Sequence, residues 1–165
     1  MLFDSGLAES IPRFFAPVLL AAIGSSLCER AGIFNIALEG MMLTGAFFAV
    51  VGCCFLGGWS GGLLLAILAG SMSGLIFWFF GIYRGGDDII VSIGFNILAV
   101  GLTAFLLRSF FDVKGQFDDL RIVEVPKIDL GIIDHLPVLG GLLSGQSILV
   151  WFALSACIFT HVILK

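Results

Sequence analysis

Five apolar stretches follow one another along the chain, separated by polar or glycine-rich breaks. They cover residues 11–27, 36–56, 59–81, 89–107 and 148–164. Each approaches the roughly 20 residues that an α-helix needs to cross about 30 Å of hydrocarbon. Their side chains do not alternate between apolar and polar positions, as the strands of a membrane barrel do. The pattern predicts an all-α, polytopic transmembrane helical bundle of about five spanning helices within a single domain, residues 1–165.

The breaks between these stretches differ in length and character. Gly57 and Gly58 form a connection so short that the second and third helices are expected to make a tight antiparallel hairpin. Residues 108–146 are much more polar, and a loop of this length with little regular pattern is expected outside the bilayer. Counted by the positive-inside rule, the Lys and Arg residues point this loop toward the cytoplasm.

Composition agrees with a membrane protein. Apolar residues make up 59% of the chain and charged residues 12%, and the mean hydropathy is +1.14. A soluble domain of this size could not bury so much apolar surface in its own core. The net charge of −4 offers no basic surface for nucleic acid, which is excluded as an expected partner.

A cluster of charged and amide side chains lies between the first two apolar stretches. It contains Glu29, Arg30, Asn35 and Glu39. Gly32 can end the first helix, Asn35 can cap the next one, and Glu39 would then lie near the positive end of the helix dipole. One interpretation is a capped helix start with an ion pair of Glu29 and Arg30. The other is a broken membrane segment whose polar groups line a transport pathway.

Small residues recur every four positions along the third stretch. They include Gly58, Gly62, Gly70 and Gly74. Small residues at this spacing let two helices approach closely in lipid. The spacing predicts helix packing, either within this chain or against another subunit.

Candidate enzymatic chemistry is not visible in the sequence. The glycine-rich residues 57–62 lack the lysine and hydroxyl that a phosphate-binding loop needs. The histidines and carboxylates show no spacing suited to zinc or to acid–base catalysis. We expect no catalytic residues, no metal and no cofactor in this chain.

Three motifs resemble permease subunits of ABC importers for nucleosides and simple sugars, a family related to the ribose and branched-chain amino-acid permeases. The first is ERAGIFNIALEGMM at residues 29–42, followed by TGAFFA at residues 44–49. The second is IVSIGFNILAVGLT at residues 90–103, and the third is LPVLG at residues 136–140. They occur in the family's order along nearly the whole chain.

The resemblance implies a multi-pass subunit of a bacterial-type inner membrane. It further implies three kinds of partner, namely a second permease subunit, cytoplasmic ATP-binding subunits and an extracytoplasmic substrate-binding protein. Against the charge count, it places the loop of residues 108–146 on the extracytoplasmic side. Members of the family are about twice as long, so the chain is expected to match the N-terminal half of such a permease.

The resemblance also singles out polar residues for the substrate pathway. Asn96 is a lone amide in the middle of the fourth stretch, where an amide commonly bonds a neighbouring helix. Its place in the second motif favours a second interpretation, in which it lines the pathway and binds a sugar or nucleobase. We include the cluster and the nearby hydroxyls in this candidate pathway: Asn35, Glu39, Thr44, Ser92, Asn96 and Thr103.

Two functions of different classes therefore stay open. In the first, the chain is a permease subunit of an ATP-driven importer for a nucleoside, a simple sugar or a similar small polar solute. In the second, it is a truncated permease remnant or a membrane-embedded assembly subunit without transport activity of its own.

Overall fold

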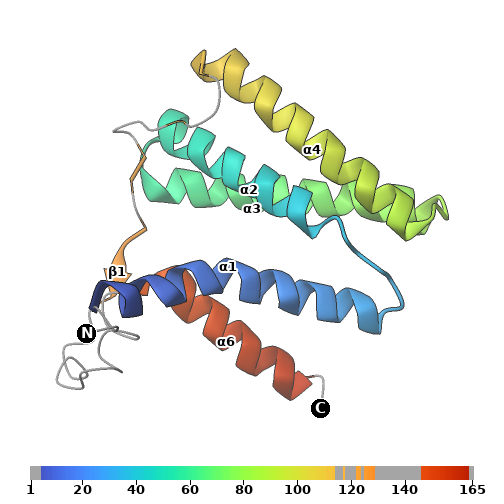
Figure 1. The fold of residues 1–165 in the computed structure, drawn as a ribbon, viewed down its shortest axis with the longest axis horizontal. Helices are drawn as coiled ribbons and strands as arrows, with labels where there is room; N and C mark the ends of the chain where they lie inside the picture. The colour runs from blue at the N-terminus through green and yellow to red at the C-terminus, as the bar shows by residue number, and fades with distance from the viewer. Residues whose placement is uncertain (1–4, 114–116, 118–121, 124, 129–145, 164–165) are drawn as a thin grey trace. The chain divides into compact units, whose positions relative to one another are not determined.

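The computed structural model describes residues 5–113, 117, 122–123, 125–128 and 146–163, and its secondary structure is mainly α-helical (Figure 1). The helices are α1 (Ser5–Arg30), α2 (Leu38–Gly52), α3 (Gly58–Phe77), α4 (Asp88–Phe111) and α6 (Ile148–Ile163). Two π-helical turns, η1 (Cys53–Gly57) and η2 (Trp78–Tyr83), extend α2 and α3. Strands β1 (Lys127–Ile128) and β2 (Gln146–Ser147) form a short antiparallel pair. The prediction of an all-α bundle is confirmed.

Length and composition identify three helical segments of the described chain that could cross a membrane. They are Ile11–Arg30, Leu38–Tyr83 and Asp88–Phe111. The second is long because it contains both α2 and α3 with their π-helical ends. The apolar helix Ile148–Ile163 is shorter, at 16 residues. The count of five spanning helices stays a prediction, and most of the loop expected at residues 108–146 lies outside the described residues.

The chain divides into two compact units. One consists of Met1–Leu27 with Val125–Lys165, and the other is Cys28–Glu124. In the first unit, α1 and α6 meet through the buried residues Ala16, Val150 and Ala153. Pro12 and Pro17 lie inside α1, a position that is tolerated in membrane helices when nearby groups satisfy the freed carbonyls.

In the second unit, α2 packs against both α3 and α4, while α3 and α4 have little contact with each other (Figure 1). The chain reverses between α2 and α3 at Gly57 and Gly58, whose φ angles are +75° and +77°. Positive φ is strained for residues with a Cβ atom, so two glycines allow a turn with no added loop. The predicted hairpin is confirmed.

The two helices of this hairpin approach each other very closely near the turn. A Cβ atom on Gly62 would lie 2.5 Å from Cys53 Sγ and 2.8 Å from the Ala49 carbonyl oxygen. A Cβ atom on Gly52 would lie 2.7 Å from Gly62 Cα. These glycines therefore fix the helix spacing, because any larger residue would push the helices apart.

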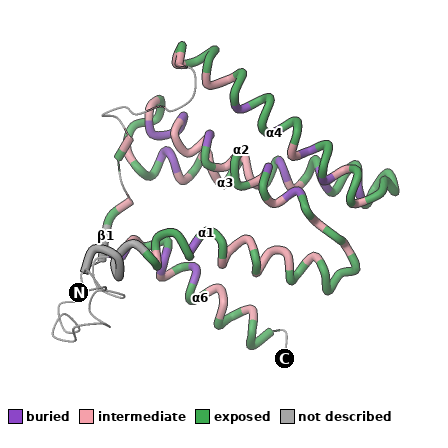
Figure 2. Tube along the Cα trace, viewed as in Figure 1, coloured by how far each residue is buried: buried purple, intermediate pink, exposed green. Residues whose placement is uncertain are grey.

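Much of the remaining helical surface is apolar and exposed (Figure 2). On α3, the side chains of Ile67, Leu68, Met72 and Leu75 are each more than half exposed. Water would disfavour so large an apolar face, whereas lipid tails or other subunits would cover it.

Candidate functional site

The break between the first two apolar stretches begins where α1 ends. The Ile33 N–H donates to the Cys28 carbonyl (2.9 Å), and the Gly32 N–H donates to the Glu29 carbonyl (3.0 Å). This pair of bonds is a Schellman motif, with Gly32 in the left-handed conformation at φ +78°. The prediction that Gly32 ends the first helix is confirmed, and its local cause is this motif.

Residues 33–36 then run without regular structure to the start of α2. The Asn35 side-chain oxygen accepts a hydrogen bond from the Ala37 N–H (2.9 Å), and its Nδ2 donates to Cys28 Sγ (3.9 Å). Asn35 thus forms an Asx turn two residues before the N-cap of α2, which is Ala37, so the prediction that Asn35 caps this helix is wrong. Glu39 lies in the first turn of α2 and is exposed, near the positive end of the helix dipole.

Three polar side chains of α4, spaced one helical turn apart, bind the backbone of this break. We call Asp88, Ser92 and Asn96 the polar ladder. Asp88 Oδ2 accepts from the Phe34 N–H (3.1 Å), and Ser92 Oγ accepts from the Ile36 N–H (3.2 Å). Asn96 Oδ1 accepts from the Gly40 N–H (2.9 Å), while its Nδ2 donates to the Ile36 carbonyl (3.1 Å).

The polar ladder supplies hydrogen-bond partners for backbone groups that the break in the helix would leave unpaired. Backbone N–H and C=O groups that leave a helix lose their partners, and lipid offers none. Ser92 is fully buried and uses its hydroxyl twice, because it also donates to the Asp88 carbonyl (2.6 Å). Direct side-chain hydrogen bonds thus hold residues 34–40 against α4.

Close packing accompanies these hydrogen bonds. Ala37 is completely buried in a cluster with Phe77, Phe95 and Ala99. A Cβ atom on Gly40 would lie 2.8 Å from Asn96 Oδ1 and 3.0 Å from the Phe95 ring. A glycine at position 40 therefore lets the start of α2 reach the polar ladder.

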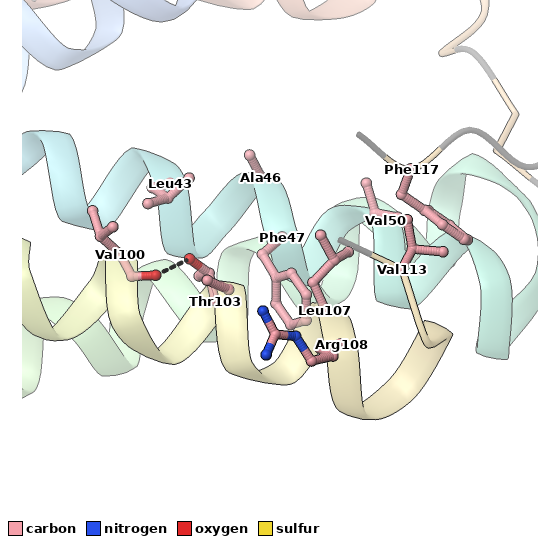
Figure 3. A pocket seen from close by; sticks show the side chains of 11 residues that line it. Leu43, Ala46, Phe47, Val50, Val100, Thr103, Leu107, Arg108, Val113 and Phe117 are labelled. Atoms are coloured by element: carbon pink, nitrogen blue, oxygen red, sulfur yellow. Dashed lines mark hydrogen bonds between the residues drawn. The ribbon is translucent and has the colours of Figure 1, made fainter. Parts of the chain in front are cut away.

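The two threonines of the candidate pathway bond their own helices. Thr44 Oγ1 donates to the Gly40 carbonyl (2.7 Å), and Thr103 Oγ1 donates to the Ala99 carbonyl (2.7 Å). Thr103 lines a groove between α2 and α4 that begins where the polar ladder ends (Figure 3). The structure thus gathers Asn35, Ser92 and Asn96 at the break and places Thr103 along the same helix pair.

A family comparison adds to this geometry. Residues 7–165 match the family model described as the branched-chain amino acid transport system permease component. The chain belongs to this permease family. It is therefore a multi-pass membrane protein of the ABC transporter class.

Three curated relatives illustrate the range of this permease family. The guanosine ABC transporter permease protein NupQ of Bacillus subtilis is 34% identical over 134 residues, which are 77% of this chain and 41% of that protein. The nucleoside ABC transporter permease protein NupC of Lactococcus lactis is 29% identical, over 84% of this chain and 45% of that protein. A Haloferax volcanii protein, provisionally named as the glucose ABC transporter permease TsgC13, is 28% identical, over 85% and 42%.

This permease chain thus spans less than half the length of each of these relatives. No solved structure gives a significant match to it.

The glycines that recur at four-residue spacing along the third apolar stretch lie in two different environments. Gly62 lies in the tight α2–α3 contact, together with Gly52 and Gly61, which sequence analysis did not single out. A Cβ atom on Gly58, Gly70 or Gly74 would meet nothing within 4 Å. A subunit contact along Gly70 and Gly74 stays a prediction, as does the ion pair of Glu29 and Arg30.

Sequence analysis also missed Asp88 and Gly40. Asp88, Ser92 and Asn96 are four positions apart, and this spacing on an otherwise apolar helix could have identified the polar ladder. The sequence gives no comparable indication for Gly40, because the need for a glycine there depends on how closely α4 approaches. Among the described residues there is no group of three or more His, Cys, Asp or Glu side chains that could hold a metal ion.

Proposed function

We propose that this chain forms the N-terminal half of a permease subunit in an ATP-driven importer. The transported solute is a nucleoside, a simple sugar or a similar small polar molecule. The main supporting observation is the polar ladder of α4, which binds the non-helical break between α1 and α2. Transporters commonly build their solute sites from such broken segments.

The polar groups near the break fit a neutral, hydrogen-bonding solute. Asn35 and Asn96 are partly exposed and carry amides that can both donate and accept, and the partly exposed Thr44 carries a hydroxyl, whereas the buried Ser92 would act through the backbone of the break. A neutral sugar or nucleoside needs such groups and no strong charge. The relatives named for guanosine, nucleosides and glucose support the same class of solute.

The remaining parts of the transporter are proposed to reside on other chains. A second permease subunit would complete the membrane pathway, and an extracytoplasmic binding protein would deliver the solute. Cytoplasmic ATP-binding subunits would hydrolyse ATP, so this chain itself would bind no cofactor. The proposed location of this assembly is the inner membrane of a bacterial-type cell.

A chimaera with the Bacillus subtilis guanosine permease tests this proposal. The matched segment of that permease is replaced by this chain, and guanosine uptake is measured in cells that lack their own permease. We expect uptake well above that of cells with an empty vector. A chimaera that reaches the membrane in parental amounts but takes up no guanosine would contradict the proposal and favour an assembly subunit or a remnant without transport activity.

The same chimaera tests the candidate pathway through Asn96→Leu. We expect uptake to fall about tenfold or more, since the loss of about 1.4 kcal/mol already has this effect. Arg84→Gln is the control, because Arg84 is an exposed residue whose guanidinium lies over the Phe79 ring and takes no part in the polar ladder. Parental uptake by a chimaera with Asn96→Leu would remove Asn96 from the pathway.

A further inference from the structure

The groove between α2 and α4 is large and mainly apolar. Its volume of about 500 Å³ falls within the range of about 300–1,000 Å³ that is usual for small-molecule sites. The side chains that define it include Leu43, Phe47, Val50, Val100, Thr103 and Arg108 (Figure 3). Thr103 and Arg108 are the two polar side chains in this set. An occupant must therefore be largely hydrocarbon with a polar end.

Arg108 marks one end of the groove. Figure 3 shows its side chain running back along α4 toward Thr103, beside Phe47. It lies in the last turn of α4, twenty positions after Asp88. At 1.5 Å per residue this separation is about 30 Å, the thickness of the hydrocarbon layer. If Asp88 lies at one membrane boundary, Arg108 lies at the other, at the depth of lipid phosphates.

Arg108 also lacks an anionic partner within the part of the chain that the structure describes. Neither a carboxylate nor an aromatic ring of those residues pairs with its guanidinium. An arginine at the membrane boundary attracts the anionic head groups of lipids. The groove therefore presents a positive charge and a hydrocarbon surface side by side.

We propose that this groove binds an anionic phospholipid, with the head-group phosphate on Arg108 and an acyl chain between α2 and α4. Basic pockets between membrane helices are known to bind anionic head groups. A membrane helix from another subunit is a poorer match, because acidic side chains are rare within membrane helices. Each anionic lipid, in contrast, carries its charge next to its acyl chains at the required depth. The proposal does not depend on the transported solute.

Lipid retention by the intact chain provides the first test. The chain is placed in nanodiscs of phosphatidylcholine mixed with phosphatidylglycerol, extracted with mild detergent, and the retained lipids are counted by mass spectrometry. We expect phosphatidylglycerol to be enriched over phosphatidylcholine about fivefold, and Arg108→Gln to abolish this enrichment. Arg108→Lys should preserve most of it, because the charge remains.

Arg84→Gln is the matched control for this experiment, since Arg84 is also exposed but lies after η2 at the other end of α4. We expect it to leave the enrichment unchanged. If both glutamine variants lower the enrichment equally, or if neither does, Arg108 is not a specific lipid contact and the proposal is wrong.

A photoreactive phosphatidylglycerol with a diazirine in its acyl chain tests the groove itself. We expect labelling to concentrate on residues 43–50 and 100–107, and to be lost when Ala46→Phe fills the groove. Labelling of Ile67 and Leu68 on the exposed face of α3 reports ordinary surrounding lipid. Equal labelling of that face and of the groove would overturn the proposal, as would an absence of labelling in the groove.

Discussion

The contact between α2 and α4 is tight and polar at one end, and leaves an apolar groove at the other. At the closed end, residues 34–40 bind residues 88–99 through the polar ladder and through Ala37 and Gly40. At the open end, residues 43–50 and 100–108 leave the groove between them. The same two helices thus form a tight polar contact and an unfilled apolar one, within a few turns of each other.

The difference shows that apolar character alone does not bring membrane helices together. The open end is lined by large apolar side chains such as Leu43, Phe47 and Val50. Lipid tails solvate such side chains as well as another helix does, so burying them gains little. The closed end instead combines small residues, which allow contact, with hydrogen bonds, which lipid cannot replace.

We expect the largest fall in the free energy of unfolding when the Asn96 hydrogen bonds at the closed end are removed. Asn96→Leu leaves the Gly40 N–H and the Ile36 carbonyl without their side-chain partner. Unpaired backbone groups in an apolar environment cost about 1–3 kcal/mol each, so we expect the free energy of unfolding to fall by about 3 kcal/mol. Reversible unfolding in mixed SDS and detergent micelles measures this change.

Thr103→Val is the matched control at the open end of the same helix. The Thr103 hydroxyl bonds the Ala99 carbonyl of its own helix, which keeps its helical partner, so we expect a cost below about 0.5 kcal/mol. Equal costs for Thr103→Val and Asn96→Leu would remove the proposed contrast between the two ends.

A methyl group at position 40 tests the close packing of the closed end. Gly40→Ala would place a Cβ atom 2.8 Å from Asn96 Oδ1, and we expect a loss of about 2 kcal/mol from overpacking. The control is Gly94→Ala on α4, where a Cβ atom meets nothing within 4 Å. That change should stabilise the helix by up to about 1 kcal/mol. If both substitutions changed the free energy of unfolding in the same direction, helix propensity rather than close contact would decide the effect at position 40.

The smallest effect is expected at the open end. Ala46→Leu extends into the groove, so we expect a change of no more than about 0.5 kcal/mol in the free energy of unfolding. The identical change at the closed end, Ala37→Leu, should cost about 2 kcal/mol because Ala37 has no exposed surface. The same unfolding assay measures both. Similar costs at the two positions would indicate that the groove closes in the membrane.

The helical architecture was predictable from sequence because it depends on local properties. Apolar run length predicts membrane helices, and the positive φ required at Gly32, Gly57 and Gly58 depends on the absence of a side chain. The helix ends were less predictable. α1 begins at Ser5, before the apolar run, and the π-helical turn η2 carries α3 on to Tyr83.

The candidate site was predictable only in part. Asn35, Ser92 and Asn96 were chosen as polar residues in apolar surroundings, and they do meet at the break. The partners of Ser92 and Asn96 could not be predicted, because those partners are backbone groups of a segment more than fifty residues away. The groove could not be predicted either, since it depends on how α2 and α4 diverge. The role of these residues in a substrate pathway stays a prediction.

The turn at Gly57 and Gly58 has a mechanical consequence. Because no loop separates the two helices there, α2 and α3 have no slack along their axes, and the interlocked glycines near the turn prevent them from sliding past each other. Any displacement of α2 must therefore move α3 with it as one rigid unit. In the proposed transport cycle, the hydrogen bonds of the polar ladder would then have to break, or α4 would have to move as well.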